Sequence, residues 1–145
     1  MENQEIKIFI IEDDFVFVNI LCGLLDDLVA EYAKKQITIN YHTFYSSKEA
    51  QYELQKKPDI ILLDYFIMND ELEIDTATKF LKAVNAEDPT IQVVIVSGQE
   101  DPELIFKLKR QGAAEYISKS PESLMNLIPV LKQIIDKRII DEPAN

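Results

Sequence analysis

The sequence is poor in cysteine, histidine and glycine, and it contains no tryptophan. Its one cysteine, Cys22, excludes an internal disulfide, so a reducing cytoplasm is the expected setting. Cys22 lies in an apolar helical pattern, where core packing is expected rather than reactivity. The one histidine, His42, lies in a predicted strand and is assigned no catalytic role, because a lone histidine there is usually packed or solvated.

Long apolar runs and a surplus of positive charge are also missing. No stretch approaches the roughly 20 apolar residues that span a bilayer, and residues 1–5 do not begin a signal peptide. Lysine and arginine number 15 against 26 acidic residues, which gives a net charge of −11. This charge argues against unaided binding to nucleic acid or to an anionic membrane.

The chain of 145 residues fits one domain with one well-formed core. We expect that core to span about residues 6–140 and the tail, residues 141–145, to be frayed. No output domain fits after the last predicted helix.

Short apolar segments alternate with segments of helical spacing along the chain. The most uniform is Asp59-Ile60-Ile61-Leu62-Leu63-Asp64, which reads as a central parallel strand covered on both faces. The predicted strands are residues 7–11, 37–44, 59–64, 91–96 and 115–118. The predicted helices are residues 15–35, 46–57, 75–86 and 102–111, and a last helix that opens at Ser120–Pro121.

This alternation predicts an α/β fold with helices on both faces of a parallel sheet. Right-handed crossovers favour the strand order 2-1-3-4-5, the flavodoxin-like three-layer sandwich with five helices. Between the third strand and the third helix, residues 65–74 form an acid-rich segment without glycine, which we predict to be a long loop.

Chemically useful side chains follow four of the five predicted strands: Glu12 and Asp13, Asp64, Ser97, and Lys119. The first and third strands are neighbours in the predicted order, so three carboxylates converge at the carboxyl edge of the sheet. A hard divalent cation such as Mg²⁺ relieves their repulsion. Each residue alone has a plainer reading as a helix-end acid, a turn or a surface lysine, but the five together favour a site.

The sequence resembles the receiver domain of two-component response regulators over about residues 6–140. The motifs that carry this resemblance are Glu12-Asp13, Asp64, Ser97-Gly98 and Tyr116-x-x-Lys119. The resemblance implies that Asp64 accepts a phosphoryl group from a histidine kinase or a histidine phosphotransfer protein. It also implies a protein that catalyses only its own phosphorylation and dephosphorylation.

The resemblance further assigns roles within the site. It implies that Mg²⁺ is bound by Asp13, Asp64 and the backbone carbonyl of Phe66, with Glu12 acting through water. Lys119 and Ser97 would hold the phosphoryl group.

The remaining implied role belongs to Tyr116, the aromatic side chain that turns inward when Ser97 moves. The signalling surface would then be the fourth helix, fifth strand and fifth helix, residues 102–137. This surface would contact a downstream protein or a second copy in a phosphorylation-dependent homodimer.

Two departures from the family pattern stand out. The family usually has proline directly after its lysine, with a cis bond between them, whereas here Ser120 intervenes and Pro121 comes next. A cis bond before a non-proline residue costs about 2.5–4 kcal/mol, so we expect a trans Lys119–Ser120 bond. The segment after Asp64 lacks the usual proline and glycine and is several residues longer than is typical.

Three other functions remain as alternatives. A haloacid-dehalogenase-like hydrolase would need a second acid two residues after Asp64, where Phe66 stands. A flavodoxin-like flavin or nucleotide binder would need a phosphate-binding Gly/Ser/Thr loop after the first strand, where acids stand instead. A pseudo-receiver would act as a scaffold for protein interactions without taking phosphate, and a phosphorylation assay separates it from a working receiver.

Overall fold

The computed structural model describes residues 4–68 and 74–141. Five parallel strands form its sheet in the order β2-β1-β3-β6-β7, which is the predicted order 2-1-3-4-5. In sequence order these strands are β1 (Gln4–Ile11), β2 (Ile37–Phe44), β3 (Ile60–Leu63), β6 (Gln92–Ser97) and β7 (Glu115–Ser118).

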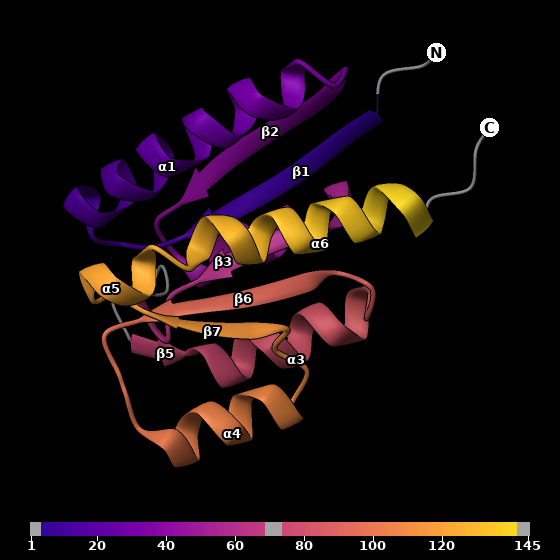
Figure 1. Cartoon of the computed structure of the whole chain (residues 1–145). Helices are drawn as coiled ribbons and strands as arrows, with labels where there is room; N and C mark the ends of the chain where they lie inside the picture. Colours follow the sequence, from indigo (N-terminus) through magenta and orange to yellow (C-terminus); the bar gives the residue numbers. More distant parts are fainter. Residues whose placement is uncertain (1–3, 69–73, 142–145) are drawn as a thin grey trace.

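Strand β3 is central because all four of its side chains are apolar and buried. Its register pairs Leu63 with Ile11 on β1 and with Ile95 on β6. Figure 1 shows the strands side by side with their carboxyl ends at one edge. The residues that follow β1, β3, β6 and β7 therefore meet at that edge.

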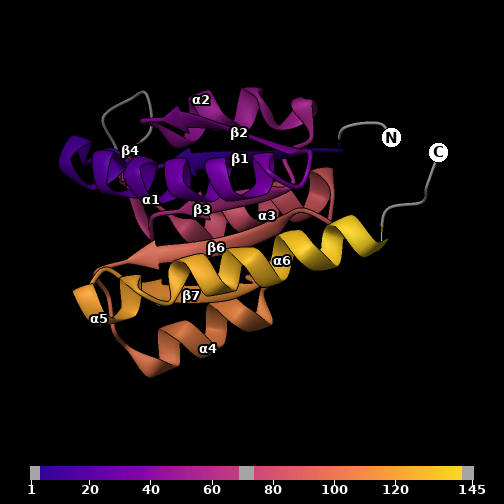
Figure 2. The ribbon, with the colours of Figure 1, turned by 45° about the horizontal axis from the view of Figure 1, so that its top comes forward.

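Helices cover both faces of the sheet, as predicted (Figures 1 and 2). One face carries α1 (Phe15–Ala33) and α6 (Leu127–Asp141). The other carries α2 (Ser47–Tyr52), α3 (Ala77–Glu87) and α4 (Pro102–Arg110). A 3₁₀ turn, η1 (Leu54–Lys56), follows α2.

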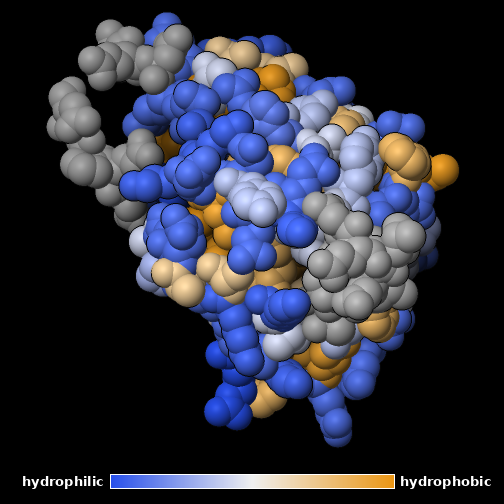
Figure 3. Space-filling view, turned by 180° about the vertical axis from the view of Figure 1, so that it is seen from behind, coloured by the Kyte–Doolittle hydropathy of each residue, from blue (hydrophilic) through white to orange (hydrophobic). Residues whose placement is uncertain are grey.

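Two apolar layers hold the helices to the sheet. Alternate side chains of each strand point to opposite faces, so Ile8 and Ile10 pack with α1 and α6 while Phe9 and Ile11 pack with α2 and α3. Seen from behind, over α2 and α3, the surface is mostly hydrophilic with apolar side chains between (Figure 3). The core therefore lies between the layers, as in other proteins of this architecture.

Polar caps begin four of the helices. The side chains of Asp14, Ser46, Asp101 and Ser120 accept hydrogen bonds from backbone N–H groups at the starts of α1, α2, α4 and α5 (Pro121–Leu124). The predicted stop of α4 at Gly112 is also present, with φ +113°, a conformation that favours glycine.

The structure corrects the prediction of a loop over residues 65–74. Strands β4 (Phe66–Met68) and β5 (Ile74–Thr76) pair antiparallel there, and α3 begins at Ala77 rather than near Asp75. Aromatic and β-branched residues at the two ends of the segment favour extended backbone, and the acids between them concealed this pattern. Residues 69–73 lie outside the described part of the chain.

The last helix is also divided, into α5 and α6, with Met125 as the C-cap of α5. The predicted cap Ser120 and first-turn Pro121 begin α5. Among the described residues no peptide bond is cis, so the Lys119–Ser120 bond is trans as predicted. In the described ranges no helix is both long and apolar enough to cross a membrane.

Candidate functional site

Backbone hydrogen bonds fix the acidic residues at the carboxyl edge of the sheet. The N–H of Asp64 donates to the carbonyl of Ile11 (3.1 Å), one residue past the paired part of β3. The N–H of Glu12 likewise donates to the carbonyl of Phe44 (3.0 Å). Each acid thus extends a strand by one residue, and its position follows from the sheet register rather than from a free loop.

The structure brings Glu12, Asp13 and Asp64 together, as the sequence predicts. One carboxylate oxygen from each lies within 4.8 Å of the others. Glu12 is buried, with 2% of its surface exposed, and the other two are partly buried. Three hard oxygen ligands in this space suit a small divalent cation, since such cations take carboxylate oxygens and water.

Lys119 reaches the same cluster from the end of β7. Its Nζ donates to Glu12 Oε1 at 2.9 Å and lies 3.5 Å from Asp64 Oδ2. Backbone pairing directs it there, because the N–H of Lys119 donates to the carbonyl of Ser97 (2.9 Å). The ammonium therefore faces two of the three clustered carboxylates.

Burial changes the protonation chemistry of these groups. The pKa of Glu12 is raised to about 8, chiefly by burial and also by the charge of Asp64, against the lowering effect of Lys119. Burial also raises the pKa of Asp64, which Lys119 opposes. The pKa of Lys119 is raised because its bonds to the carboxylates outweigh its own burial.

Ser97 and Tyr116 lie on the opposite side of the site from Glu12. Ser97 ends β6 with 1% of its surface exposed, and its hydroxyl accepts a hydrogen bond from the N–H of Gln99 at 3.3 Å. Tyr116 is buried, with its hydroxyl donating to the carbonyl of Gln99. Burial raises the pKa of Tyr116, and the charges of Asp64 and Tyr65 add to this.

Phe66 occupies a different setting from the one expected. It is the first residue of β4 rather than part of a loop, and its ring packs edge-on against Tyr65, with ring centroids 4.7 Å apart. The predicted ligand is its backbone carbonyl, and that role stays a prediction. Sequence reasoning missed Gln99, whose only signal is its place two residues after Ser97.

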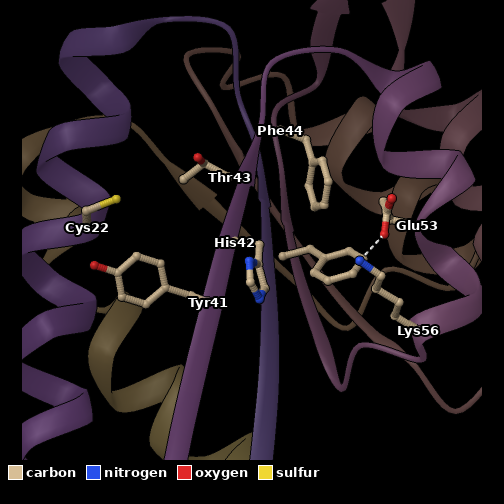
Figure 4. Close-up of a pocket in the computed structure, with 8 residues that line it drawn as sticks. Cys22, Tyr41, His42, Thr43, Phe44, Glu53 and Lys56 are labelled. Carbon is tan, nitrogen blue, oxygen red and sulfur yellow. Dashed lines mark ion pairs between the residues drawn. The ribbon is translucent and has the colours of Figure 1, made fainter.

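A pocket at the edge strand β2 lies apart from the acidic cluster (Figure 4). Cys22 and Tyr41 line it from the α1 side, whereas His42, Phe44 and Glu53 lie on the α2 side of the strand. Two of its polar side chains, Glu53 and Lys56, pair with each other, and the Tyr41 hydroxyl is bonded to Asp26. Within the described residues, the acids that gather closely enough to hold a metal ion are Glu12, Asp13 and Asp64 at the strand ends.

A family model described as the response regulator receiver domain matches residues 8–129. The chain belongs to this family. This receiver domain is thus a signalling domain of two-component systems. Phosphorylation and Mg²⁺ binding at an acidic pocket are general features of the receiver domain family. A search of curated protein sequences found no match.

Solved structures share the fold of this receiver domain at low sequence identity. A two-component response regulator from Clostridium difficile superposes with a TM-score of 0.72 at 21% identity, covering 94% of this chain and 99% of that one. The chemotaxis protein CheY4 of Vibrio cholerae superposes with a TM-score of 0.68 at 20% identity, covering 90% of this chain and 98% of that one. NtrX from Brucella abortus gives a TM-score of 0.74 at 18% identity over 94% of this chain, which spans only 29% of the NtrX chain.

Proposed function

We propose that Asp64 accepts a phosphoryl group from a histidine kinase or a histidine phosphotransfer protein in a Mg²⁺-dependent step. One observation carries this proposal: within a receiver domain, Asp64 follows the central strand, clusters with Glu12 and Asp13, and lies 3.5 Å from the Lys119 ammonium. The protein would work in the cytoplasm and catalyse only its own phosphorylation and dephosphorylation.

The transfer is a nucleophilic substitution at phosphorus. A carboxylate oxygen of Asp64 forms the new P–O bond while the P–N bond to the donor imidazole breaks, and the imidazole keeps the bonding electrons. The product on Asp64 is an acyl phosphate. Lys119 would hold its oxygens by charge and Ser97 by its hydroxyl, which the 3.5 Å distance from Lys119 Nζ to Asp64 Oδ2 supports for the lysine.

The acidic cluster fits the metal that this chemistry needs. Asp13, Asp64 and the carbonyl of Phe66 would hold Mg²⁺, and Glu12 would act through a bound water. When bound, the ion supplies positive charge that offsets the charge of the phosphoryl oxygens. Lys119 contributes a second positive charge from β7.

The signal would leave the site through Ser97 and Tyr116. A phosphoryl oxygen would accept a hydrogen bond from the Ser97 hydroxyl and draw that side chain toward Asp64, away from the N–H of Gln99, whose carbonyl accepts from Tyr116. The surface affected would be α4, β7 and α6, roughly residues 102–137. We propose that this surface contacts a downstream protein, or a second copy of the chain after phosphorylation.

Acetyl phosphate with Mg²⁺ tests the proposal without a cognate kinase. The wild-type protein should gain the mass of one phosphoryl group, and the gain should require Mg²⁺ and disappear in Asp64→Asn. Asp27→Asn, which changes an exposed acid on α1, is the matched control and should be labelled like the wild type. No labelling of the folded wild-type protein would favour the pseudo-receiver alternative.

A further inference from the structure

The Lys119 ammonium has a third neighbour besides the two carboxylates. Its Nζ lies 4.4 Å from the centroid of the Phe17 ring. An ammonium within about 6 Å of a ring centroid is attracted to the negative face of the ring, and the attraction grows as water is excluded. Phe17 is buried and only 23% of the Lys119 side chain is exposed, so this contact is largely screened from water.

The ring is held firmly. Phe17 belongs to the apolar layer between α1 and the sheet. The side chain of Asp14, the third acid after β1, caps α1 and accepts hydrogen bonds from the N–H groups of Val16 (2.9 Å) and Phe17 (3.3 Å). The cap fixes the first turn of the helix, and the first turn fixes the ring under the ammonium.

The ammonium of a lysine ends a flexible stem with several rotamers, so it needs more than one contact to stay in a single place. Its closest contact here is with Glu12, not with Asp64. An apolar side chain of similar size at position 17 would fill the same space without favouring the charge. The aromatic ring favours the charge and offers no competing hydrogen bond.

We propose that Phe17 is a positioning residue for the phosphoryl transfer, one that holds the Lys119 ammonium beside Asp64 through a cation–π contact. The expected effect on phosphorylation rests on the proposed function of Asp64, whereas the contact itself rests on the Phe17–Lys119 geometry. Loss of the ring's negative face should slow phosphorylation of Asp64 by about five- to thirty-fold, the range that a partly desolvated cation–π contact supports.

The test replaces Phe17 in the full chain by site-specific incorporation of 3,4,5-trifluorophenylalanine, which keeps the shape of the ring and removes most of its negative face. Phosphorylation by acetyl phosphate with Mg²⁺ should slow, whereas the same replacement at buried Phe9, outside the site, should leave the rate unchanged. Phe17→Leu should behave like the fluorinated variant, and Phe17→Trp should restore most of the rate. A normal rate with trifluorophenylalanine at position 17 would overturn the proposal.

A second readout does not require phosphorylation. In protein labelled with ¹³C-lysine, the ring current of Phe17 should shift the Lys119 ε-methylene protons upfield, and Phe17→Leu should abolish this shift while thermal melting shows that the variant is folded. If the wild type takes no phosphoryl group, the proposed function of Asp64 fails, and this shift still decides the contact. An unshifted Lys119 signal in the wild type would contradict it.

Discussion

At the scale of single residues, the site combines groups that repel one another. Glu12, Asp13 and Asp64 lie within one small space, and Lys119 balances only part of their charge. Without a cation the cluster is therefore expected to hold a proton that ordinary surface acids release. The raised pKa values of Glu12 and Asp64 express this.

The first prediction concerns the stability of the metal-free protein against pH. The pKa of Glu12 is raised from 4.5 to about 8, so between these values the unfolded chain has lost a proton that the folded chain keeps. Stability from this group is full below 4.5 and is lost as pH rises through about 8. Urea unfolding in EDTA across this range should show a falling midpoint, because the free energy of unfolding decreases by at most about 1.4 kcal/mol per pH unit from one group.

Glu12→Gln supplies the control for this pH dependence. The amide keeps nearly the same size and carries no titrating proton, so the decline between these pH values should become shallower. The raised pKa of Asp64 gives the remaining slope the same sign. A wild-type midpoint that rises with pH in EDTA would contradict the charge balance described above.

Much of the site can be predicted from the sequence, because the strands that position it are easy to recognise. Strand register places Glu12, Asp64 and Lys119 at one edge, and register is encoded by short apolar runs that are easy to read. The Lys119–Phe17 contact could not be predicted, because it depends on a rotamer and on the turn set by the Asp14 cap.

At the scale of elements, α6 is fastened to the opposite edge of the sheet from the site. Arg138 Nε donates to Asp59 Oδ1 at 2.6 Å, and its Nη1 donates to the carbonyl of Thr90 at 2.8 Å. Asp59 in turn accepts from the N–H of Lys7 at 2.8 Å. One arginine thus joins the last helix to the residues just before β3 and β6 and, through Asp59, to β1.

We predict that Arg138→Met lowers the free energy of unfolding by about 1–3 kcal/mol, because it leaves the partly buried Asp59 without its positively charged partner. Lys132→Met is the matched control on the same helix. Its ion pair with Glu31 is far more exposed, so its loss should cost under about 1 kcal/mol. Urea denaturation of both variants decides, and equal effects would show that the Arg138 contacts add nothing particular.

A second prediction at this scale concerns α4, β7 and α6. Beryllofluoride with Mg²⁺, a phosphoryl mimic, should change amide hydrogen exchange in residues 102–137, because Ser97 and Tyr116 share Gln99 as a partner. Exchange in β2, at the far edge of the sheet, should stay unchanged and serves as the internal control. Unchanged exchange in residues 102–137 would leave the proposed signalling surface without support.

Some helices and strands could be predicted from the sequence and others could not. Strands and caps were predictable because apolar runs and residues such as Ser46, Asp101 and Ser120 act locally. The hairpin β4–β5 was not, because strands of three residues give little periodicity and depend on pairing with each other. The division between α5 and α6 has one local signal, Pro129 in the first turn of α6, and the prediction of a single last helix did not use it.

At the scale of the whole molecule, Mg²⁺ should stabilise the fold. A ligand that binds only the folded state adds about 1.4 kcal/mol at tenfold its dissociation constant. The melting temperature should therefore rise with millimolar Mg²⁺, and Asp13→Ala should remove most of the rise. Asp27→Ala, on the exposed side of α1, should keep it, and an equal rise in Asp13→Ala would place the ion elsewhere.

The net charge of −11 can also attract Mg²⁺ without a specific site, so the stabilisation needs a control. Acidic proteins attract divalent cations weakly over the whole surface, and salt screens such attraction. The melting comparison is therefore made at constant ionic strength, with Ca²⁺ or NaCl replacing Mg²⁺. Stabilisation by a specific site should be lost when NaCl replaces Mg²⁺, and it should remain only with a divalent cation that the acidic cluster binds.

The proposed acyl phosphate on Asp64 can be located by chemical mapping. Protein treated with acetyl phosphate and Mg²⁺ is reduced with borohydride, which converts a phosphorylated aspartate to homoserine, and its peptides are sequenced by mass spectrometry. We predict homoserine at position 64 of the wild type and none in Asp64→Asn. Homoserine at position 13, or at any position other than 64, would contradict this prediction.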